Sequence, residues 1–242
     1  MKKKAQVTIF VIIALVLIAL ILGGYFLFKK NNSGLNEESK VVFSYVQDCL
    51  DKSSEKVIWR IGKGGGFFYP SENSTNEGIT YYYRYGNFLF PLKEDIEEEI
   101  SKFVSIELLN CTNNFSNFKE YSISFSNPVS HTEILKDKIN IYVEYPIKIS
   151  KGQEISILKE FSVIKEVRLG LIYDTVEKML IEGYKKNGIC LSCNLEHSLD
   201  NDFEIDYLNS DSLTTILIIK DNYLYSNKPF EFIFANDYSK KI

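Results

Sequence analysis

Residues 139–149, INIYVEYPIKI, decide the fold class because apolar and polar side chains alternate along them. A period of two is typical of a β-strand with one buried face. Neighbouring runs at residues 121–125, 132–135 and 155–163 repeat this alternation. The turn at residues 136–138, KDK, can join the second run to the quoted stretch as a hairpin. We therefore predict an antiparallel meander in this part of the chain.

Helices are predicted on both sides of the meander, because apolar residues recur there every three to four positions. The three helices cover residues 40–61, 92–109 and 166–186, and two late strands cover residues 213–219 and 230–234. A glycine-rich turn at residues 62–66 ends the first helix, Pro91 opens the second, and Asn187-Gly188 ends the third. This order predicts an α+β fold in which antiparallel sheet packs with about three helices.

Residues 79–85, ITYYYRY, form a further strand candidate that is rich in tyrosine. Alternation places Ile79, Tyr81, Tyr83 and Tyr85 on one face of the strand. An exposed stripe of this kind could stack on sugar rings or contact a protein, whereas a buried stripe belongs to the core. We expect the stripe to lie in the core.

Residues 9–28, IFVIIALVLIALILGGYFLF, contain no charged side chain. A helix of this length spans about 30 Å, the thickness of a hydrocarbon core, so we predict one transmembrane helix with the lipid bilayer as its partner. Lys2, Lys3 and Lys4 precede it and only two lysines follow it directly, which favours a cytoplasmic N-terminus and an extracellular main domain. The predicted order is a short cytoplasmic segment (1–8), the membrane helix (9–28), a polar tether (29–39) and an extracytoplasmic α+β domain (40–242).

The chain beyond the membrane segment is acidic. Residues 31–242 hold 23 Lys and Arg against 32 Asp and Glu, a net charge of −9, and the other five basic residues lie before position 31. A domain of that sign is repelled by phosphate backbones, so we expect no binding of nucleic acid through a broad basic face.

All four cysteines follow the membrane segment and would lie in a compartment where disulfides persist. Cys49 falls on the buried face of the first predicted helix and Cys111 lies just beyond the second, so one bond could join the two helices. Closing that loop would stabilise the fold by about 4 kcal/mol if chain entropy dominates. Cys190 and Cys193 are close enough in the sequence to pair with each other.

Residues 190–197, CLSCNLEH, are the one segment with conceivable chemistry, since two thiolates and the His197 imidazole suit zinc. A single CxxC lacks the second pair of a zinc ribbon, and a redox role needs a thiolate stabilised at a helix N-terminus. Cys190 instead follows the end of the third predicted helix, and His197 reads as part of a polar loop. We therefore predict a local disulfide between Cys190 and Cys193, and no catalytic residue, metal site or cofactor.

Residues 2–8, KKKAQVT, lie ahead of the apolar helix and resemble archaeal type IV pilin-like signal sequences. In that family a prepilin peptidase cuts before Gln, which implies cleavage between Ala5 and Gln6. The fifth mature residue of the best-known pilins is a Glu that registers subunits, whereas Phe10 stands there in this chain.

Over residues 2–185 the chain also resembles uncharacterised single-pass membrane-anchored proteins of small-genome archaea. The resemblance rests on the N-terminal start, Cys49 in a helix, the glycine turn before Pro91, and Cys111 after an acidic helix. It implies the location and the architecture, and it contributes no catalytic residue.

These features together favour a membrane-anchored domain without catalytic activity that binds an envelope protein or a glycan, or that has a structural role in the envelope. A type IV pilin-like filament subunit is the first alternative. A metal-binding or redox domain that uses Cys190 and Cys193 is the second.

Overall fold

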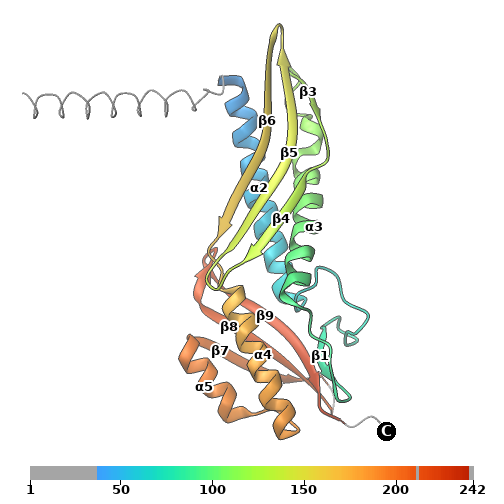
Figure 1. Cartoon of the computed structure of the whole chain (residues 1–242), viewed down its shortest axis with the longest axis vertical. Coiled ribbons are helices and arrows are strands. Elements are labelled where there is room, and N and C mark those ends of the chain that lie inside the picture. Colours follow the sequence, from blue (N-terminus) through green and yellow to red (C-terminus); the bar gives the residue numbers. More distant parts are fainter. Residues whose placement is uncertain (1–36, 211–212, 240–242) are drawn as a thin grey trace, which may run out of the picture. The chain divides into compact units, whose positions relative to one another are not determined.

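The computed structural model describes residues 37–210 and 213–239 (Figure 1). Residues 41–242 belong to one compact unit. The predicted membrane helix at 9–28, most of the predicted tether and the cleavage position at Ala5 and Gln6 lie outside the described residues. No helix within the two described ranges is both long and apolar enough to cross a bilayer.

Two long helices, α2 (Glu37–Lys63) and α3 (Lys93–Thr112), come first in the described chain. Both match the predicted helices, although α2 begins three residues early, inside the predicted tether. The Leu92 N–H donates to Asp95 Oδ2 over 2.9 Å and caps the start of α3.

The first sheet contains the predicted alternating runs. Its strands are β3 (Ser122–Phe125), β4 (Val129–Ile134), β5 (Ile139–Lys151) and β6 (Glu154–Lys165). β6 pairs along one edge of β5, while β4 and then β3 pair along its other edge, all antiparallel. The simple meander is therefore wrong, because β3 pairs with β5 and not with β4. The short link at residues 126–128 contains Pro128 and lets the chain continue along the same edge of β5.

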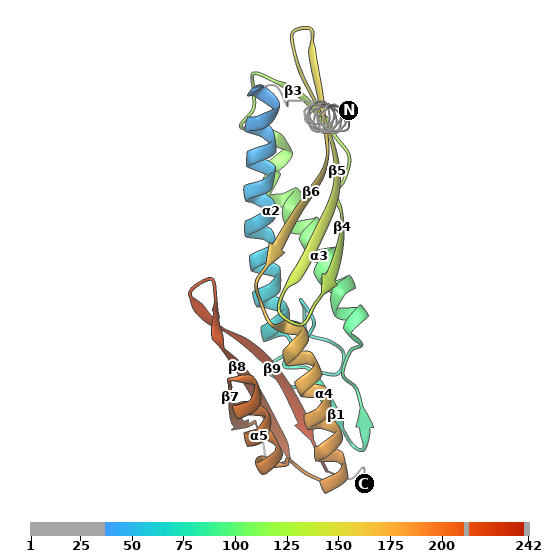
Figure 2. The same cartoon turned by 60° about the vertical axis from the view of Figure 1, so that its left-hand side comes forward.

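The helices lie alongside this sheet (Figures 1 and 2). Ser101 Oγ of α3 donates to Thr132 Oγ1 of β4 over 2.9 Å. Gln47 Nε2 of α2 donates to the Ser162 carbonyl of β6 over 2.8 Å. α3 is thus held against β4 and α2 against β6, and the apolar faces of both helices join the core.

The second sheet has the order β2-β1-β9-β8-β7. Its strands are β1 (Tyr81–Arg84), β2 (Asn87–Phe88), β7 (Phe203–Asn209), β8 (Thr214–Tyr225) and β9 (Lys228–Asp237). β1 runs parallel to β9, and Tyr81 lies opposite Ala235. The sheet is therefore mixed, and the prediction of purely antiparallel pairing is wrong at this one junction.

Two more helices follow the first sheet, α4 (Leu169–Lys186) and α5 (Leu191–Asn201). α4 was predicted and ends as expected at Asn187, which adopts a left-handed conformation. α5 was not predicted, since its residues were interpreted as a polar loop. The fold class is α+β, with four α-helices and two sheets in the described chain.

One face of the second sheet is buried in the main core, and the other carries a small apolar cluster. Phe230, Phe232 and Phe234 of β9 enter the main core, which also receives residues from α2, α3, α4 and β5. Ala235 lies on the opposite face in a smaller apolar cluster with Tyr81 and Ile216. Burial of the phenylalanine face fixes the register of the sheet, because a one-residue slip would move these rings to the other face.

The tyrosine stripe lies only partly as predicted. Tyr81 and Tyr83 are buried, as expected for core residues, but Tyr82 is also fully buried. Its hydroxyl donates to the Gly65 carbonyl over 3.1 Å. Tyr85 lies beyond the strand, has a positive φ of 52° and is exposed. The difference arises because this strand is short, kinked between Tyr81 and Tyr83, and covered on two sides.

Candidate functional site

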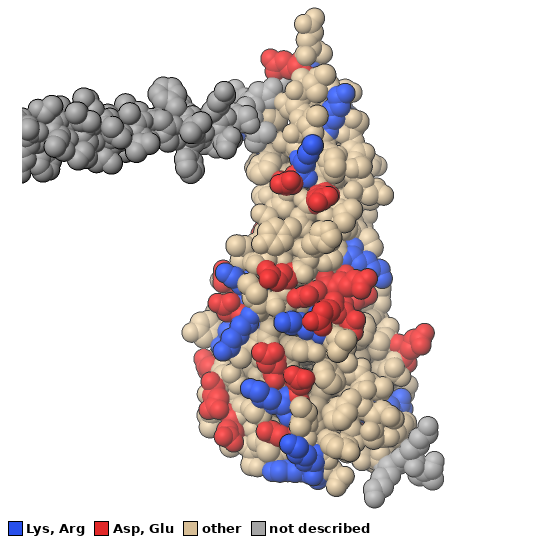
Figure 3. All heavy atoms as spheres, in the orientation of Figure 1, with Lys and Arg blue, Asp and Glu red and all other residues tan. Residues whose placement is uncertain are grey.

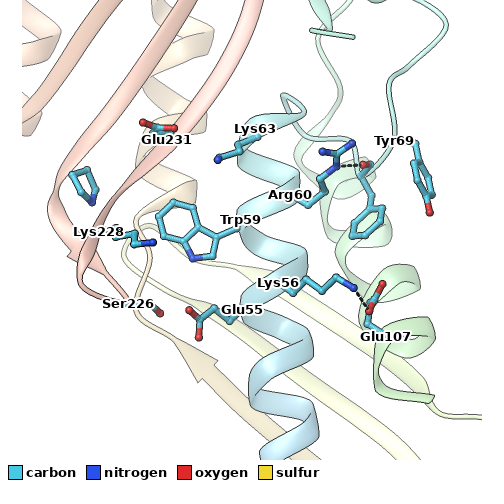
Figure 4. Close-up of a pocket in the computed structure, with 12 residues that line it drawn as sticks. Glu55, Lys56, Trp59, Arg60, Lys63, Tyr69, Glu107, Ser226, Lys228 and Glu231 are labelled. Atoms are coloured by element: carbon cyan, nitrogen blue, oxygen red, sulfur yellow. Dashed lines mark hydrogen bonds and ion pairs between the residues drawn. The ribbon is translucent and has the colours of Figure 1, made fainter. Parts of the chain in front are cut away.

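A groove of about 940 Å³ lies between α2, the segment that follows it, α3 and the β8–β9 hairpin (Figure 4). Three aromatic, four basic and three acidic residues line it, together with Ser226 and Pro229. Two smaller hollows in the described residues, of about 460 and 420 Å³, both include His131. Binding sites are usually concave and combine apolar walls with a few polar groups, so the large groove is the candidate site.

One stretch of α2 supplies five of the lining side chains. Glu55, Trp59 and Lys63 are spaced by four positions and form one row along the helix. Lys56 and Arg60 have the same spacing and form the adjacent row. The helix thus presents an aromatic ring between charges of both signs (Figure 4).

The aromatic walls of the groove are held by packing. The Trp59 ring lies 5.5 Å from the rings of both Tyr225 and Phe230, so its position is tied to the β8–β9 hairpin. Across the groove, Tyr69 is 64% exposed and packs edge-on against Phe103 at 5.4 Å. Contacts of this geometry fix the rings without burying them completely, which leaves apolar surface available to a ligand.

The charges in the groove fall into a paired and an unpaired set. Lys56 Nζ lies 2.6 Å from Glu107 Oε2, and Arg60 Nε donates to the Phe68 carbonyl over 2.9 Å. Lys63 and Lys228 form no ion pair with any residue in the described ranges, and the terminal nitrogens of Arg60 have no hydrogen-bond acceptor there. Glu55 and Glu231 are also without an ion-pair partner among the described residues.

Unpaired cations in one hollow contrast with the rest of an acidic domain. On the face shown in Figure 3, basic side chains are scattered among acidic ones, and acidic side chains gather near the middle of the view. The groove therefore offers donors to an anion at a place where the domain as a whole carries negative charge.

Tyr225 lies directly behind the Trp59 ring. It is buried, and its hydroxyl forms no hydrogen bond in the described structure. Burial raises the pKa of this hydroxyl well above its usual range, and the nearby carboxylates of Glu55 and Asp51 raise the pKa further. Tyr225 is thus a neutral support for the indole at ordinary pH.

Cys190 and Cys193 form a disulfide with a Cα–Cα distance of 5.3 Å, as the sequence predicted. The surroundings of this pair differ from the prediction. Cys190 is the N-cap of α5, and its sulfur accepts a hydrogen bond from the Cys193 N–H over 3.2 Å. The argument that Cys190 lies at the wrong end of a helix for redox chemistry is therefore wrong.

His197 lies within α5 and not in a loop. Its Nε2 is 3.0 Å from Glu182 Oε2 of α4, and this contact joins the two helices. Among the described residues no group of three or more His, Cys, Asp and Glu side chains is arranged to hold a metal ion.

Cys49 and Cys111 form the second disulfide, with a Cα–Cα distance of 5.6 Å. Cys49 is 1% exposed, and the bond joins the middle of α2 to the last turn of α3, as predicted. This pair is structural, because it lies in the core between two helices.

Sequence reasoning did not find the groove, because its walls come from four separate segments. Trp59 carried the one available signal. It is the single tryptophan of the chain and lies outside the buried stripe of its predicted helix. Single apolar residues on the polar side of a helix are common, so this signal by itself does not identify a contact surface.

No protein-family model matches this chain, and neither a curated protein nor a solved structure is detectably similar to it.

Proposed function

We propose that this chain is a membrane-anchored, extracytoplasmic binding domain, and that its groove beside Trp59 binds an anionic carbohydrate of the cell envelope. The observation that carries this proposal is the combination of a held aromatic plane with unpaired cations in one hollow. The role of the groove is binding without catalysis, and the apolar segment at residues 9–28 holds the domain at the membrane.

The aromatic residues support a ligand with flat apolar faces. The C–H face of a sugar ring can lie on the Trp59 indole, which is half-buried and fixed by Tyr225 and Phe230. Tyr69 offers a second exposed ring on the opposite side of the groove. Rings that are already in place lose little conformational entropy when a ligand binds.

The charges support a ligand that carries both carboxylate and hydroxyl groups. Arg60, Lys63 and Lys228 can donate to a carboxylate, and the planar guanidinium suits it best. Glu55 and Glu231 can accept hydrogen bonds from hydroxyl groups. A purely anionic ligand would be repelled by these two acids, whereas an acidic sugar uses donors and acceptors together.

Fluorescence of the single tryptophan tests the proposal directly. The full chain in detergent micelles is titrated with a short uronic-acid oligosaccharide, with a neutral oligosaccharide of equal length and with an acidic peptide. We expect saturable change of the Trp59 emission with the acidic sugar, weakening at high salt as charge pairs are screened. A change of emission with the peptide alone would show that the ligand is a polypeptide and not a sugar. No change with any of the three would overturn the proposal that the groove is a binding site.

Paired variants locate the site by calorimetry, which does not depend on the indole. Lys63→Gln and Lys228→Gln should each raise the Kd for the acidic sugar about tenfold, the equivalent of one hydrogen bond to a charged group. Lys185→Gln is the control, because Lys185 is exposed on α4 and is no part of the groove. Equal increases of Kd for all three substitutions would show that the sugar responds to the net charge of the domain and not to the groove.

A further inference from the structure

The disulfide between Cys190 and Cys193 occupies the first turn of α5. Cys190 is the N-cap, and its sulfur accepts the Cys193 N–H at 3.2 Å. Backbone N–H groups at a helix N-terminus carry partial positive charge and stabilise a thiolate. If the bond opens, the Cys190 sulfur therefore has a ready site for negative charge.

A cation lies against both sulfur atoms. Lys186 Nζ is 3.0 Å from Cys190 Sγ and 3.5 Å from Cys193 Sγ. Lys186 belongs to the last turn of α4, and the tight turn at Asn187 brings it to the start of α5. It is exposed and forms no ion pair with a carboxylate in the described chain, so the two sulfurs are the partners that the described structure gives its ammonium group. Nearby, Glu182 and His197 bind each other at 3.0 Å.

The two sulfurs differ in their access to solvent. Cys190 is 4% exposed, whereas Cys193 is half-buried. A thiolate from outside therefore reaches Cys193, and Cys190 is the sulfur that leaves. The sulfur of Cys190 is both the one stabilised as a thiolate and the one released in the exchange. This arrangement speeds exchange, because a leaving thiol of lower pKa departs faster.

From this geometry we infer that Cys190 and Cys193 form a redox-active pair that exchanges with external dithiols, a function separate from the groove. The first substrate thiolate attacks Cys193 Sγ, the bond between Cys193 and Cys190 breaks, and Cys190 departs as a thiolate beside Lys186. The second substrate thiolate then attacks the substrate sulfur of the mixed disulfide and releases Cys193. The substrate dithiol becomes a disulfide, and the protein gains the two electrons.

The other disulfide provides an internal comparison. Cys49 is buried in the middle of α2, and Cys111 lies in the last turn of α3, where the negative end of the helix dipole disfavours a thiolate. Cys111 is half-buried like Cys193, so a thiolate that attacks it would expel Cys49, which lies inside α2 and accepts no hydrogen bond from a lysine in the described structure. Cys49–Cys111 therefore lacks the stabilised leaving group that Cys190–Cys193 possesses.

Limited reduction distinguishes the two bonds. The full chain in detergent is treated with dithiothreitol at neutral pH without denaturant, alkylated, and mapped by peptide mass. We expect Cys190 and Cys193 to be alkylated at least tenfold faster than Cys49 and Cys111. Equal rates for the two pairs, or faster reduction of Cys49–Cys111, would overturn the inference.

The role of Lys186 is tested by a pH profile, which loss of packing would not move. In the reduced protein the ultraviolet absorbance of thiolates is followed against pH, and the curve of Cys190→Ser is subtracted so that the difference reports Cys190, which is too buried for an alkylation rate to follow its thiolate fraction. Lys186→Met should move this profile up by about one pH unit, a tenfold loss of thiolate at neutral pH, since a neighbouring cation lowers a pKa by that order. Lys185→Met, the exposed neighbour, should leave the profile unchanged. Equal profiles for wild type and Lys186→Met would refute the assigned stabilisation of the leaving sulfur.

Discussion

Removal of the disulfide between α2 and α3 is the most quantitative perturbation that the structure offers. Cys49 and Cys111 are separated by 62 positions, whereas Cys190 and Cys193 are separated by 3. Loop-closure entropy then assigns about 4 kcal/mol of the free energy of unfolding to the first bond and about 1.5 kcal/mol to the second. The double variant Cys49→Ala/Cys111→Ala should therefore be much less stable than Cys190→Ala/Cys193→Ala.

Urea unfolding of the full chain in detergent measures both losses, with Trp59 as the reporter. The indole packs on Tyr225 and Phe230, so its emission should shift to the red when the β8–β9 hairpin leaves α2. With a slope of about 2 kcal/mol per molar urea, the long-loop variant should unfold at a urea concentration about 2 M lower than the wild type. The short-loop variant should shift by less than half as much.

Two outcomes would refute this reasoning. One is a loss below about 1 kcal/mol for the Cys49 and Cys111 variant, far less than the loop-entropy value. The other is a larger loss for the Cys190 and Cys193 variant, which would give the bond at α5 the structural role. Cys190→Ala/Cys193→Ala protein in which Cys49–Cys111 has been reduced serves as the control for the small cavity left by alanine. Reduction should cost it about as much free energy of unfolding as the Cys49→Ala/Cys111→Ala change costs the wild type.

Three further predictions concern the second sheet and its surroundings. Arg168→Met should lower the free energy of unfolding by about 3 to 5 kcal/mol in urea titrations, because the Asp221 side chain, 2% exposed, loses the guanidinium that pairs with it. A loss below about 1 kcal/mol would show that this ion pair does not stabilise the fold as a buried pair does. Gly65→Ala should lower the Tm more than Gly152→Ala. Both glycines have positive φ, but only at Gly65 would a Cβ meet a backbone oxygen of β9, at 2.7 Å. Equal Tm shifts would show that the backbone conformation alone determines the loss. Burial and a neighbouring tyrosine raise the pKa of Tyr238 to about 12 from 10.0. The stability that its neutral hydroxyl contributes is therefore complete below pH 10 and is lost as the pH rises through 12. The urea midpoint should fall across this range of pH, and it should fall less steeply in Tyr238→Phe.

Most of the regular elements could be predicted from local pattern. The alternation in residues 139–149 identified β5, and the glycines after Lys63 and the Asn187-Gly188 pair located the ends of α2 and α4. Each of these signals arises within a few residues, through side-chain period or through a left-handed turn.

The missed elements depend on contacts that local pattern does not contain. α5 has leucines at positions 191, 195 and 199, but all three are exposed, so they mark no buried face. The parallel pairing of β1 with β9 joins distant parts of the sequence, and the edge-sharing of β3 and β4 depends on the length of β5. The groove and the Lys186 contact were invisible for the same reason, since each requires separate segments to meet in the folded chain.

The pairing of Tyr81 with Ala235 also sets an order of events when the chain is made. α2, α3 and the first sheet can meet as soon as residues up to β6 have emerged, because the strands and the disulfide that join these elements to one another are then complete. β1 and β2 precede that sheet in the sequence, yet they wait for the last strand, which adds between β1 and β8. Closure of such a long loop is slow, and an unpaired strand edge is prone to wrong pairing in the interval. A chain that stops before β9 would therefore leave the tyrosine-rich strand β1 without its partner. Such a chain should be recognised as misfolded, so correct folding of this protein depends on its final residues.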